Sequence, residues 1–149
     1  MLVVKRDGKR EPVAFDKITA RIKKLCYGFD PNQVDPTVVA QKVVAGVYGG
    51  VTPIALDDLA SETAAYLTTQ HPDYGRLAAR IAVSNLHKQT DKSFSATITK
   101  LHGYINPKNG QKAPLIGEDV IEIVTANAAR LDSAIIYDRD FEYDYFGYK

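Results

Sequence analysis

The sequence predicts an α+β fold that is mostly α, in which a short β-hairpin or small sheet caps a four-helix bundle and further helices follow. Three observations carry this prediction. An Asp-Gly pair separates two short β-tolerant runs, four stretches in succession have helical apolar spacing, and composition changes near Lys92. With 149 residues, of which 45% are hydrophobic and 25% charged, the chain has room for one or two small domains.

The first predicted element is the hairpin. Residues 2–5 and 10–14 flank Asp7-Gly8, a pair typical of tight hairpin turns. The turn would bring Lys5 and Lys9 close together. Eight of the first 24 residues are basic and three are acidic, in a chain whose net charge is only +1. This local excess of positive charge points to an anionic ligand.

The first helix is predicted to begin with Asp16 as its N-cap and to run to about Tyr27, where Gly28 ends it. Its apolar residues follow helical spacing. The positions expected to face the core are Ile18, Ile22, Leu25 and Cys26.

Three more helices follow before residue 92. Asp35-Pro36 and Thr52-Pro53 each combine an N-cap acceptor with proline in the first turn, and His71-Pro72 separates the third helix from a fourth over residues 74–88. Gly49-Gly50 is expected to end the second helix. The expected core positions are Val39, Val43, Val47, Tyr48, Leu56, Leu59, Ala60, Thr63, Ala64, Leu67, Leu77, Ala78, Ile81, Ala82 and Leu86.

Composition changes after Lys92, so we predict two domains, residues 1–92 and 93–149. The first part has a net charge of +3 and the second −2, and six of the 14 aromatic residues lie between Tyr137 and Tyr148. The second part is expected to hold helices over residues 94–104 and 118–131, with a turn-rich loop at Asn106–Gly110. The aromatic end is expected to pack against protein outside this chain.

Several classes of function are excluded by the sequence. No apolar run approaches the roughly 18 residues of a membrane span, so no membrane partner is expected. The single cysteine, Cys26, excludes an internal disulfide and a cysteine zinc site, and favours a cytosolic or nuclear setting, of which we expect the cytoplasm. Three scattered histidines predict no metal site. The pI near 7.8 argues against nucleic acid as a partner, and neither a Walker motif nor GxGxxG is present.

A hairpin that leads directly into a helix has three features that favour phosphate binding: free N–H groups at the first turn, the positive end of the helix dipole, and flanking lysines. Lys5, Lys9 and Lys17 could converge there, and Lys88 could reach the same place from the fourth helix. The alternative is that these lysines form an ordinary solvated face.

Long stretches of the chain resemble a known family. The segments KRDGKREPVAFDKI and RLAARIAVSNLHK resemble an ATP-cone domain. Together with FDKITARIKKLCYG, YINPKNG and RLDSAIIYDRDFEYDYFGYK, they resemble the N-terminal region of the large subunit of class I ribonucleotide reductase of the eukaryotic type.

The resemblance implies a regulatory function. In that family the ATP-cone binds ATP, which permits turnover, or dATP, which stops it by changing the quaternary assembly. Implied partners are other large subunits and the small radical-generating subunit, and Mg²⁺ is expected on the triphosphate. The catalytic cysteines of the family lie later in its sequence. Since this chain has only Cys26, it is expected to be the N-terminal piece of a longer enzyme, without catalytic residues of its own.

The resemblance also assigns roles to residues of this chain. It implies that Lys5, Arg6, Lys17 and Lys88 surround the phosphates, with Lys9 added on charge alone. Glu11 would lie at the adenine end, and Asp57 would take part in base recognition and in the response to dATP. Val13, Ala14, Phe15 and Ile18 would line the base and ribose side, and Asp16 would open the first helix, where its backbone meets the nucleotide.

This chain departs from the family pattern at one place. Relatives commonly carry Val-Thr-Thr-x-Glu-Leu-Asp where this chain has Val51–Asp57, so that Pro53 and Ala55 replace a threonine and a glutamate. Pro53 has no hydroxyl and no N–H to donate. Thr52 could substitute through its side chain, or affinity and ATP/dATP selectivity could be altered.

Two other functions remain as alternatives. One is an ATP-cone transcriptional regulator, whose four-cysteine zinc ribbon a chain with one cysteine lacks. The other is a plain helical protein-interaction module with an incidental basic face. Nucleotide binding distinguishes the regulatory function from this last alternative.

Overall fold

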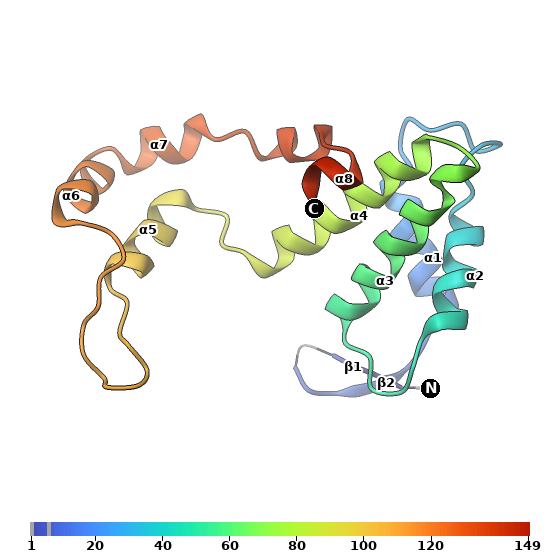
Figure 1. Ribbon diagram of the computed structural model, residues 1–149, viewed down its shortest axis with the longest axis horizontal. Helices are drawn as coiled ribbons and strands as arrows, with labels where there is room; N and C mark the ends of the chain where they lie inside the picture. Colours follow the sequence, from blue (N-terminus) through green and yellow to red (C-terminus); the bar gives the residue numbers. More distant parts are fainter. Residues whose placement is uncertain (1, 6) are drawn as a thin grey trace. The chain divides into compact units, whose positions relative to one another are not determined.

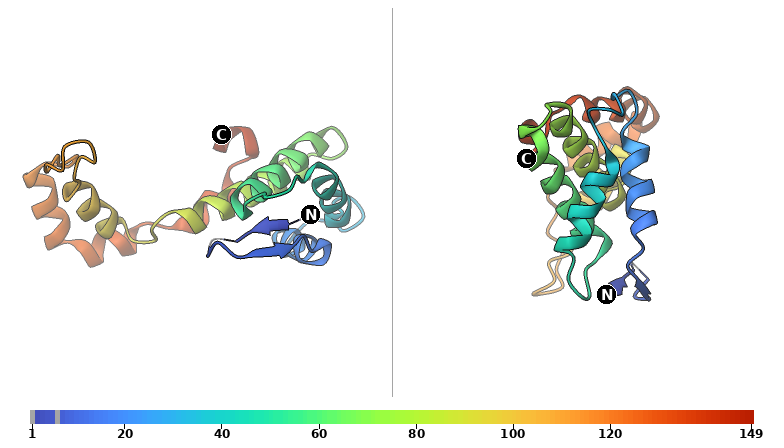
Figure 2. Two further views of the ribbon diagram at one scale, coloured as in Figure 1. Left: turned by 90° about the horizontal axis from the view of Figure 1, so that it is seen from below. Right: turned by 90° about the vertical axis from the view of Figure 1, so that its right-hand side faces the viewer.

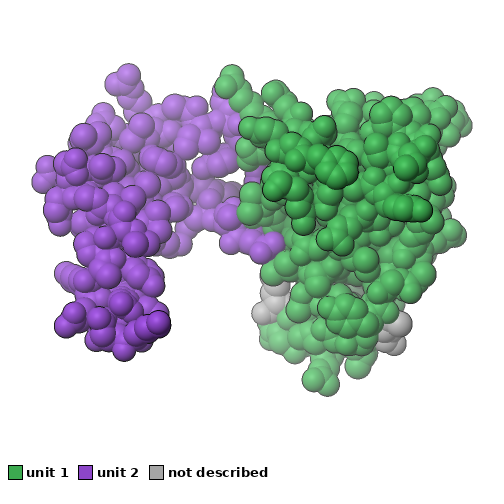
Figure 3. All heavy atoms as spheres, in the orientation of Figure 1, with its two compact units in different colours: residues 1–86, 139–149 green, residues 87–138 purple. Residues whose placement is uncertain are grey.

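The computed structural model describes residues 2–5 and 7–149, and it divides into two compact units (Figure 3). The first unit comprises Met1–Leu86 together with Arg139–Lys149, and the second comprises His87–Asp138. The domain boundary near Lys92 stays a prediction. Among the described residues, no helix combines the length and the apolar character that crossing a bilayer requires.

The predicted hairpin is confirmed. Strands β1 (Leu2–Val4) and β2 (Arg10–Pro12) pair antiparallel, with Val3 opposite Glu11. The Lys5 N–H donates to the Lys9 carbonyl at 2.7 Å, and the Gly8 N–H donates to the Lys5 carbonyl at 2.9 Å. Gly8 has a φ of +81°, a conformation that glycine adopts without a Cβ penalty. The Asp-Gly pair therefore acts as the turn that it predicted.

The hairpin lies at one end of the helices of the first unit (Figures 1 and 2). The free edge of β1 is attached to the loop between the second and third helices. The Val4 N–H donates to the Val51 carbonyl at 3.0 Å, and the Gly50 N–H donates to the Leu2 carbonyl at 2.9 Å. These bonds fix the hairpin against the start of the third helix.

Helix α1 (Phe15–Leu25) begins one residue before Asp16, so the predicted Asp16 cap is wrong. Ala14 is the N-cap, and no side chain accepts a hydrogen bond there. The chain leaves β2 in extended conformation and turns at Ala14, which places Asp16 inside the first turn. At the other end, the buried Arg80 donates to the carbonyls of Leu25 and Tyr27 at 2.9 and 2.7 Å.

The other three helices of the bundle are confirmed: α2 (Pro36–Gly46), α3 (Pro53–Tyr66) and α4 (Asp73–Gln89). The short 3-10 helix η1 (Leu67–Thr69) lies between the last two. Asp35 accepts from the Thr37 N–H at 2.7 Å, and Thr52 accepts from the Ala55 N–H at 3.2 Å. Both caps are the local ones that their sequences predict.

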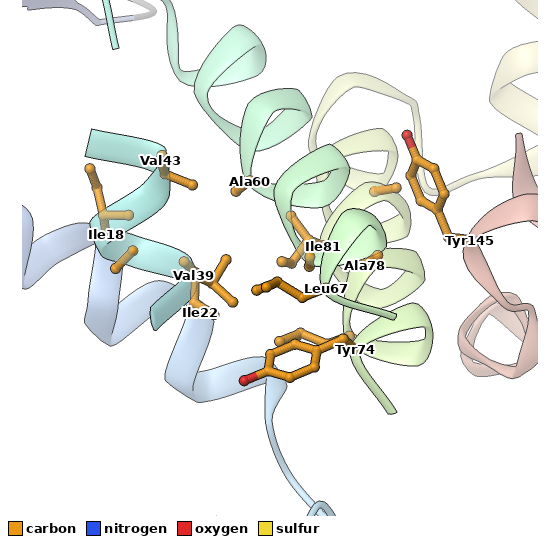
Figure 4. Packing of buried hydrophobic residues seen from close by; sticks show 14 of the residues in the cluster. Ile18, Ile22, Val39, Val43, Ala60, Leu67, Tyr74, Ala78, Ile81 and Tyr145 are labelled. Atoms are coloured by element: carbon orange, nitrogen blue, oxygen red, sulfur yellow. The ribbon is translucent and has the colours of Figure 1, made fainter. Parts of the chain in front are cut away.

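Valine, isoleucine, leucine and alanine side chains of the four helices form the core, which Figure 4 shows from close by. Two predicted core positions are wrong. Tyr48 is exposed, because α2 ends at Gly46 and Tyr48 lies in the loop beyond it. Leu86 is exposed, because the core cluster ends on α4 at Ala82, one turn earlier.

The second unit contains α5 (Phe94–His102), α6 (Glu118–Ala126) and α7 (Ala128–Ala134). The single helix predicted over residues 118–131 is therefore wrong. It breaks at Asn127, whose φ is −119° and whose side-chain amide donates to the Ile123 carbonyl at 2.9 Å. Asparagine competes in this way with the backbone ladder. The predicted turn-rich loop is confirmed by the Gly110 N–H, which donates to the Asn106 carbonyl.

The end of the chain forms the 3-10 helix η2 (Tyr137–Glu142) and the short helix α8 (Tyr145–Tyr148). The aromatic residues there were expected to pack against protein outside this chain. Tyr145 instead belongs to the core cluster of the first unit, and Tyr148 packs against that cluster, whereas Tyr143 and Phe146 are exposed.

Candidate functional site, a basic cavity beside the hairpin

A cavity of about 150 Å³ lies where the hairpin, the start of α1 and the start of α3 meet. Pockets that enclose a whole drug-sized ligand measure about 300–1,000 Å³. This cavity therefore encloses only part of a nucleotide-sized ligand. The described residues of its lining comprise three cations, one carboxylate and several apolar side chains. They are Val3, Lys5, Glu11, Pro12, Val13, Ala14, Lys17, Ile18, Arg21, Pro53 and Leu56.

Glu11 connects two of the cations. Its Oε2 lies 3.2 Å from Lys5 Nζ and 3.5 Å from Lys17 Nζ. The hydrogen bond and charge of Lys5, followed by the charge of Lys17, lower the pKa of Glu11 from its usual value. Two lysines thus share one carboxylate, which leaves an excess of positive charge at this side of the cavity.

The first turn of α1 contributes backbone donors to the same side. Ala14 has no side-chain acceptor, and no side chain in the described part of the chain caps the N–H groups of the first turn. These groups carry the positive end of the helix dipole, the usual place for an anion. Ala14 and Lys17 both line the cavity, so this end of the helix belongs to it.

Arg21 and Asp57 join α1 to α3 by a two-point contact. Arg21 Nε donates to Asp57 Oδ1 at 2.5 Å, and Arg21 Nη2 donates to Asp57 Oδ2 at 2.6 Å. Asp57 is 5% exposed and is not among the lining residues, whereas Arg21 lines the cavity. The sequence analysis did not identify Arg21. Its position, one helical turn after Lys17 on the same face, is a signal that could have found it.

Seven of the predicted site residues line the cavity: Lys5, Glu11, Val13, Ala14, Lys17, Ile18 and Pro53. Lys9 lies instead at the hairpin turn, where it pairs with Asp7 at 3.5 Å. Phe15 and Asp16 belong to the first turn of α1 without lining the cavity. Lys88 is exposed in the last turn of α4, within the second unit. Arg6 lies outside the described residues.

The segment that departs from the family pattern forms the start of α3. Thr52 Oγ1 accepts from the Ala55 N–H, so the hydroxyl oxygen serves as the α3 cap. Pro53, the first residue of α3, presents its ring to the cavity beside Leu56. This wall is apolar, and Pro53 offers it no donor.

A protein-held metal site finds no support in the part of the chain that the structure describes, where no three His, Cys, Asp or Glu side chains gather as ligands. Cys26 is partly buried, and burial raises the pKa of its thiol to about 11. A thiol with so high a pKa is a poor metal ligand and a poor nucleophile.

Comparison with known proteins adds independent evidence. Residues 1–89 match the family model described as the ATP cone domain. Across all 149 residues, the chain is 66% identical to the ribonucleoside-diphosphate reductase large subunit of Arabidopsis thaliana, of which it covers 18%. It is 61% identical to the large chain of Neurospora crassa, of which it covers 16%, and 56% identical to the large subunit of Vaccinia virus, of which it covers 19%.

The chain therefore spans less than a fifth of the length of these relatives. The matched family model covers the hairpin and the helices α1, α2, α3 and α4, and it accounts for more than half of the chain. The fold and this match agree, and the chain belongs to the ATP-cone domain family.

Proposed function

We propose that this chain is the allosteric nucleotide-binding region of a ribonucleoside-diphosphate reductase large subunit, and that ATP and dATP bind in the cavity beside the hairpin. The observation that carries the proposal is the convergence of three cations, Lys5, Lys17 and Arg21, on one cavity that also includes the uncapped start of α1.

The charged part of the lining suits a polyphosphate. Ammonium groups and a guanidinium attract it by charge, and the first-turn N–H groups of α1 add directed hydrogen bonds. The apolar part, to which Val13, Ile18 and Pro53 belong, suits the flat face of a base. The small volume supports a ligand that is only partly enclosed, with the remainder at the surface.

Magnesium fits this proposal as a companion of the nucleotide. Mg²⁺ commonly binds through substrate phosphates and keeps several waters. The one carboxylate in the lining is Glu11, which is paired with two lysines. We therefore propose that the ion arrives on the phosphates and that the described residues bind the complex through its charge.

The names of the relatives support the larger context. Each is a ribonucleoside-diphosphate reductase large subunit or chain. We propose that ATP activates and dATP inhibits such a subunit through this region, in the cytoplasm, by favouring different assemblies with further large subunits and with the small subunit. Moving an assembly equilibrium from 1:99 to 99:1 requires roughly 5.5 kcal/mol of differential binding, which several copies can share.

Isothermal titration of the 149-residue chain with ATP and with dATP, in magnesium buffer, tests the proposal. We expect saturable binding of both at about one site per chain. Lys5→Ala should weaken binding at least about tenfold, because hydrogen bonds between charged groups contribute roughly 1.5–3 kcal/mol. Lys24→Ala is the matched control, since Lys24 is exposed on α1 and does not line the cavity. Absence of binding by a chain with normal circular dichroism would refute the proposal and favour a plain helical interaction module.

A further inference from the structure

We infer that Arg21 is a nucleotide-binding residue of this cavity, and that Asp57, which does not line it, acts as the residue that positions Arg21. The inference rests on the proposed function. It adds a binding residue that the sequence analysis did not identify, and it gives Asp57 a physical role that does not require contact with the nucleotide.

The contact between the two side chains is of the kind that fixes a guanidinium. Both carboxylate oxygens of Asp57 accept, one from Nε and one from Nη2, at 2.5 and 2.6 Å. Two parallel charge-assisted bonds restrain both the position and the plane of the guanidinium, which a single bond to one nitrogen does not. Asp57 is buried on α3, so it provides a rigid support.

The pair leaves part of Arg21 available to a ligand. About a third of the Arg21 side chain is exposed, at 34%, and the residue lines the cavity. Among the described residues, Nη1 makes no hydrogen bond, and both known contacts use the opposite edge of the guanidinium. A guanidinium has five N–H donors, so Arg21 can donate to Asp57 and to an anion at the same time.

Arg21 also continues the cationic face of α1. Lys17 and Arg21 are four residues apart, which places their side chains one above the other on the same side of the helix. An anion that extends along α1 from its first turn meets Lys17 and then Arg21. Lys17 shares Glu11 with Lys5, whereas Arg21 is held by a carboxylate outside the lining.

Removing one member of this pair has different consequences from removing the other. Arg21→Ala removes a cation and leaves the buried Asp57 carboxylate without this guanidinium, close to an anionic ligand. Asp57→Asn keeps the Arg21 cation and weakens only the hydrogen bonds that fix its orientation. The two residues therefore have non-additive effects on affinity if Asp57 acts through Arg21.

The test is a double-mutant cycle in the full 149-residue chain, with ATP and dATP affinities measured by isothermal titration. Arg21→Ala should weaken binding at least about 30-fold and Asp57→Asn about 5- to 10-fold. In the Arg21→Ala background, Asp57→Asn should give no further loss or a partial recovery. Arg21→Lys should not restore binding, because an ammonium group cannot make the two-point contact. Lys24→Ala should bind as the original chain does.

A second measurement covers the case in which Arg21→Ala fails to fold. The Nε–H signal of Arg21, observed by ¹⁵N NMR in the original chain, should shift on addition of ATP and shift less in Asp57→Asn. Three results would each overturn the inference. The first is an equal loss of affinity from Asp57→Asn in the presence and in the absence of Arg21. The second is an Arg21→Lys variant that binds as tightly as the original chain, and the third is an Nε–H signal that does not move on addition of ATP. If the original chain binds ATP and these outcomes appear, the inference alone is refuted. If the original chain binds neither nucleotide, the proposed function is refuted as well.

Discussion

At the residue scale, the contacts of Glu11 bear most directly on how the cavity would bind a phosphate group. The resemblance places it at the adenine end of the nucleotide, yet its carboxylate lies between Lys5 and Lys17, the lysines expected to meet the phosphates. Glu11 thus holds these lysines in place. Its lowered pKa means that the pairs persist at neutral pH and are lost as the pH falls through that lowered value.

Glu11→Gln should therefore strengthen the binding of inorganic tripolyphosphate. Removing the carboxylate charge ends the competition between Glu11 and the phosphate groups for the two lysines. Both ion pairs are exposed and screened by salt, so affinity should rise by up to about fivefold, and most at low salt. Titration calorimetry measures the change, and Asp7→Asn at the hairpin turn is the matched control. Unchanged or weaker tripolyphosphate binding by Glu11→Gln would contradict this role.

Cys26 should react slowly with alkylating reagents. Its pKa of about 11, raised mainly by burial from the model-peptide value of 9.0, makes the thiolate fraction at pH 8 about 100-fold smaller than for an unperturbed thiol. Higher intrinsic nucleophilicity offsets part of this, so we expect alkylation at least about 10-fold slower than in the denatured chain. The shift also stabilises the fold below pH 9, and this contribution is lost as the pH rises toward 11. Equal alkylation rates in the folded and denatured chain would show that Cys26 is not buried as described.

At the scale of the elements, the start of α3 sets the chemistry of one cavity wall. Thr52 accepts a hydrogen bond as the helix cap and does not line the cavity, and Pro53, which does, has no donor to offer. Proline in this position favours the helix and removes a donor at the same time. The proline at the start of α3, which makes this helix easy to predict, thus also makes this wall of the cavity apolar.

Pro53→Thr should raise affinity for ATP. The substitution restores a hydroxyl and a backbone N–H at a residue that lines the cavity. One added hydrogen bond contributes about 0.5–1.5 kcal/mol, which corresponds to a gain of about 2- to 10-fold. Pro36→Thr is the matched control, because Pro36 holds the same position in α2 and does not line the cavity. A Pro53→Thr variant that folds normally and binds ATP no better would show that this wall does not face the nucleotide.

Local signals explain which elements could be predicted. The caps at Asp35 and Thr52 and the Asp7-Gly8 turn depend on neighbouring residues, and all three are confirmed. The break at Asn127 was missed because asparagine can lie within a helix or interrupt one. Arg21 could have been found as a lining residue from its place one turn after Lys17, whereas its bond to Asp57, 36 positions along the sequence, has no local signal. Six of the predicted site residues come together because the hairpin leads directly into α1, and the bonds between β1 and residues 50–51 bring Pro53 to them.

At the scale of the whole molecule, the last residues of the chain pack onto the core of the first unit. Residues 139–149 join the first compact unit, and Tyr145 is buried in its core cluster. The sequence could not predict this, because an aromatic-rich end looks the same whether it packs within its own chain or on another domain. Only the tertiary structure distinguishes the two cases.

Tyr145→Ala should destabilise the first unit. Truncating a buried aromatic side chain costs about 3–5 kcal/mol in well-packed cores, and a residue at the edge of the chain should cost about 2–4 kcal/mol. Urea unfolding followed by circular dichroism measures this loss of unfolding free energy. Tyr143→Ala, which truncates an exposed tyrosine of the same segment, should change it by less than about 0.5 kcal/mol. Equal effects of the two substitutions would contradict the packing described for Tyr145.

The central claim is that the nucleotide occupies the cavity formed by the hairpin, α1 and α3. The most direct test is a ¹H–¹⁵N NMR titration of the 149-residue chain with ATP and magnesium. We expect the largest chemical-shift changes at the backbone amides of Phe15–Ile18, at Lys5 and Glu11, and at the Arg21 side chain, with little change in α6. Saturable changes centred on the second unit, or none near the start of α1, would contradict the claim.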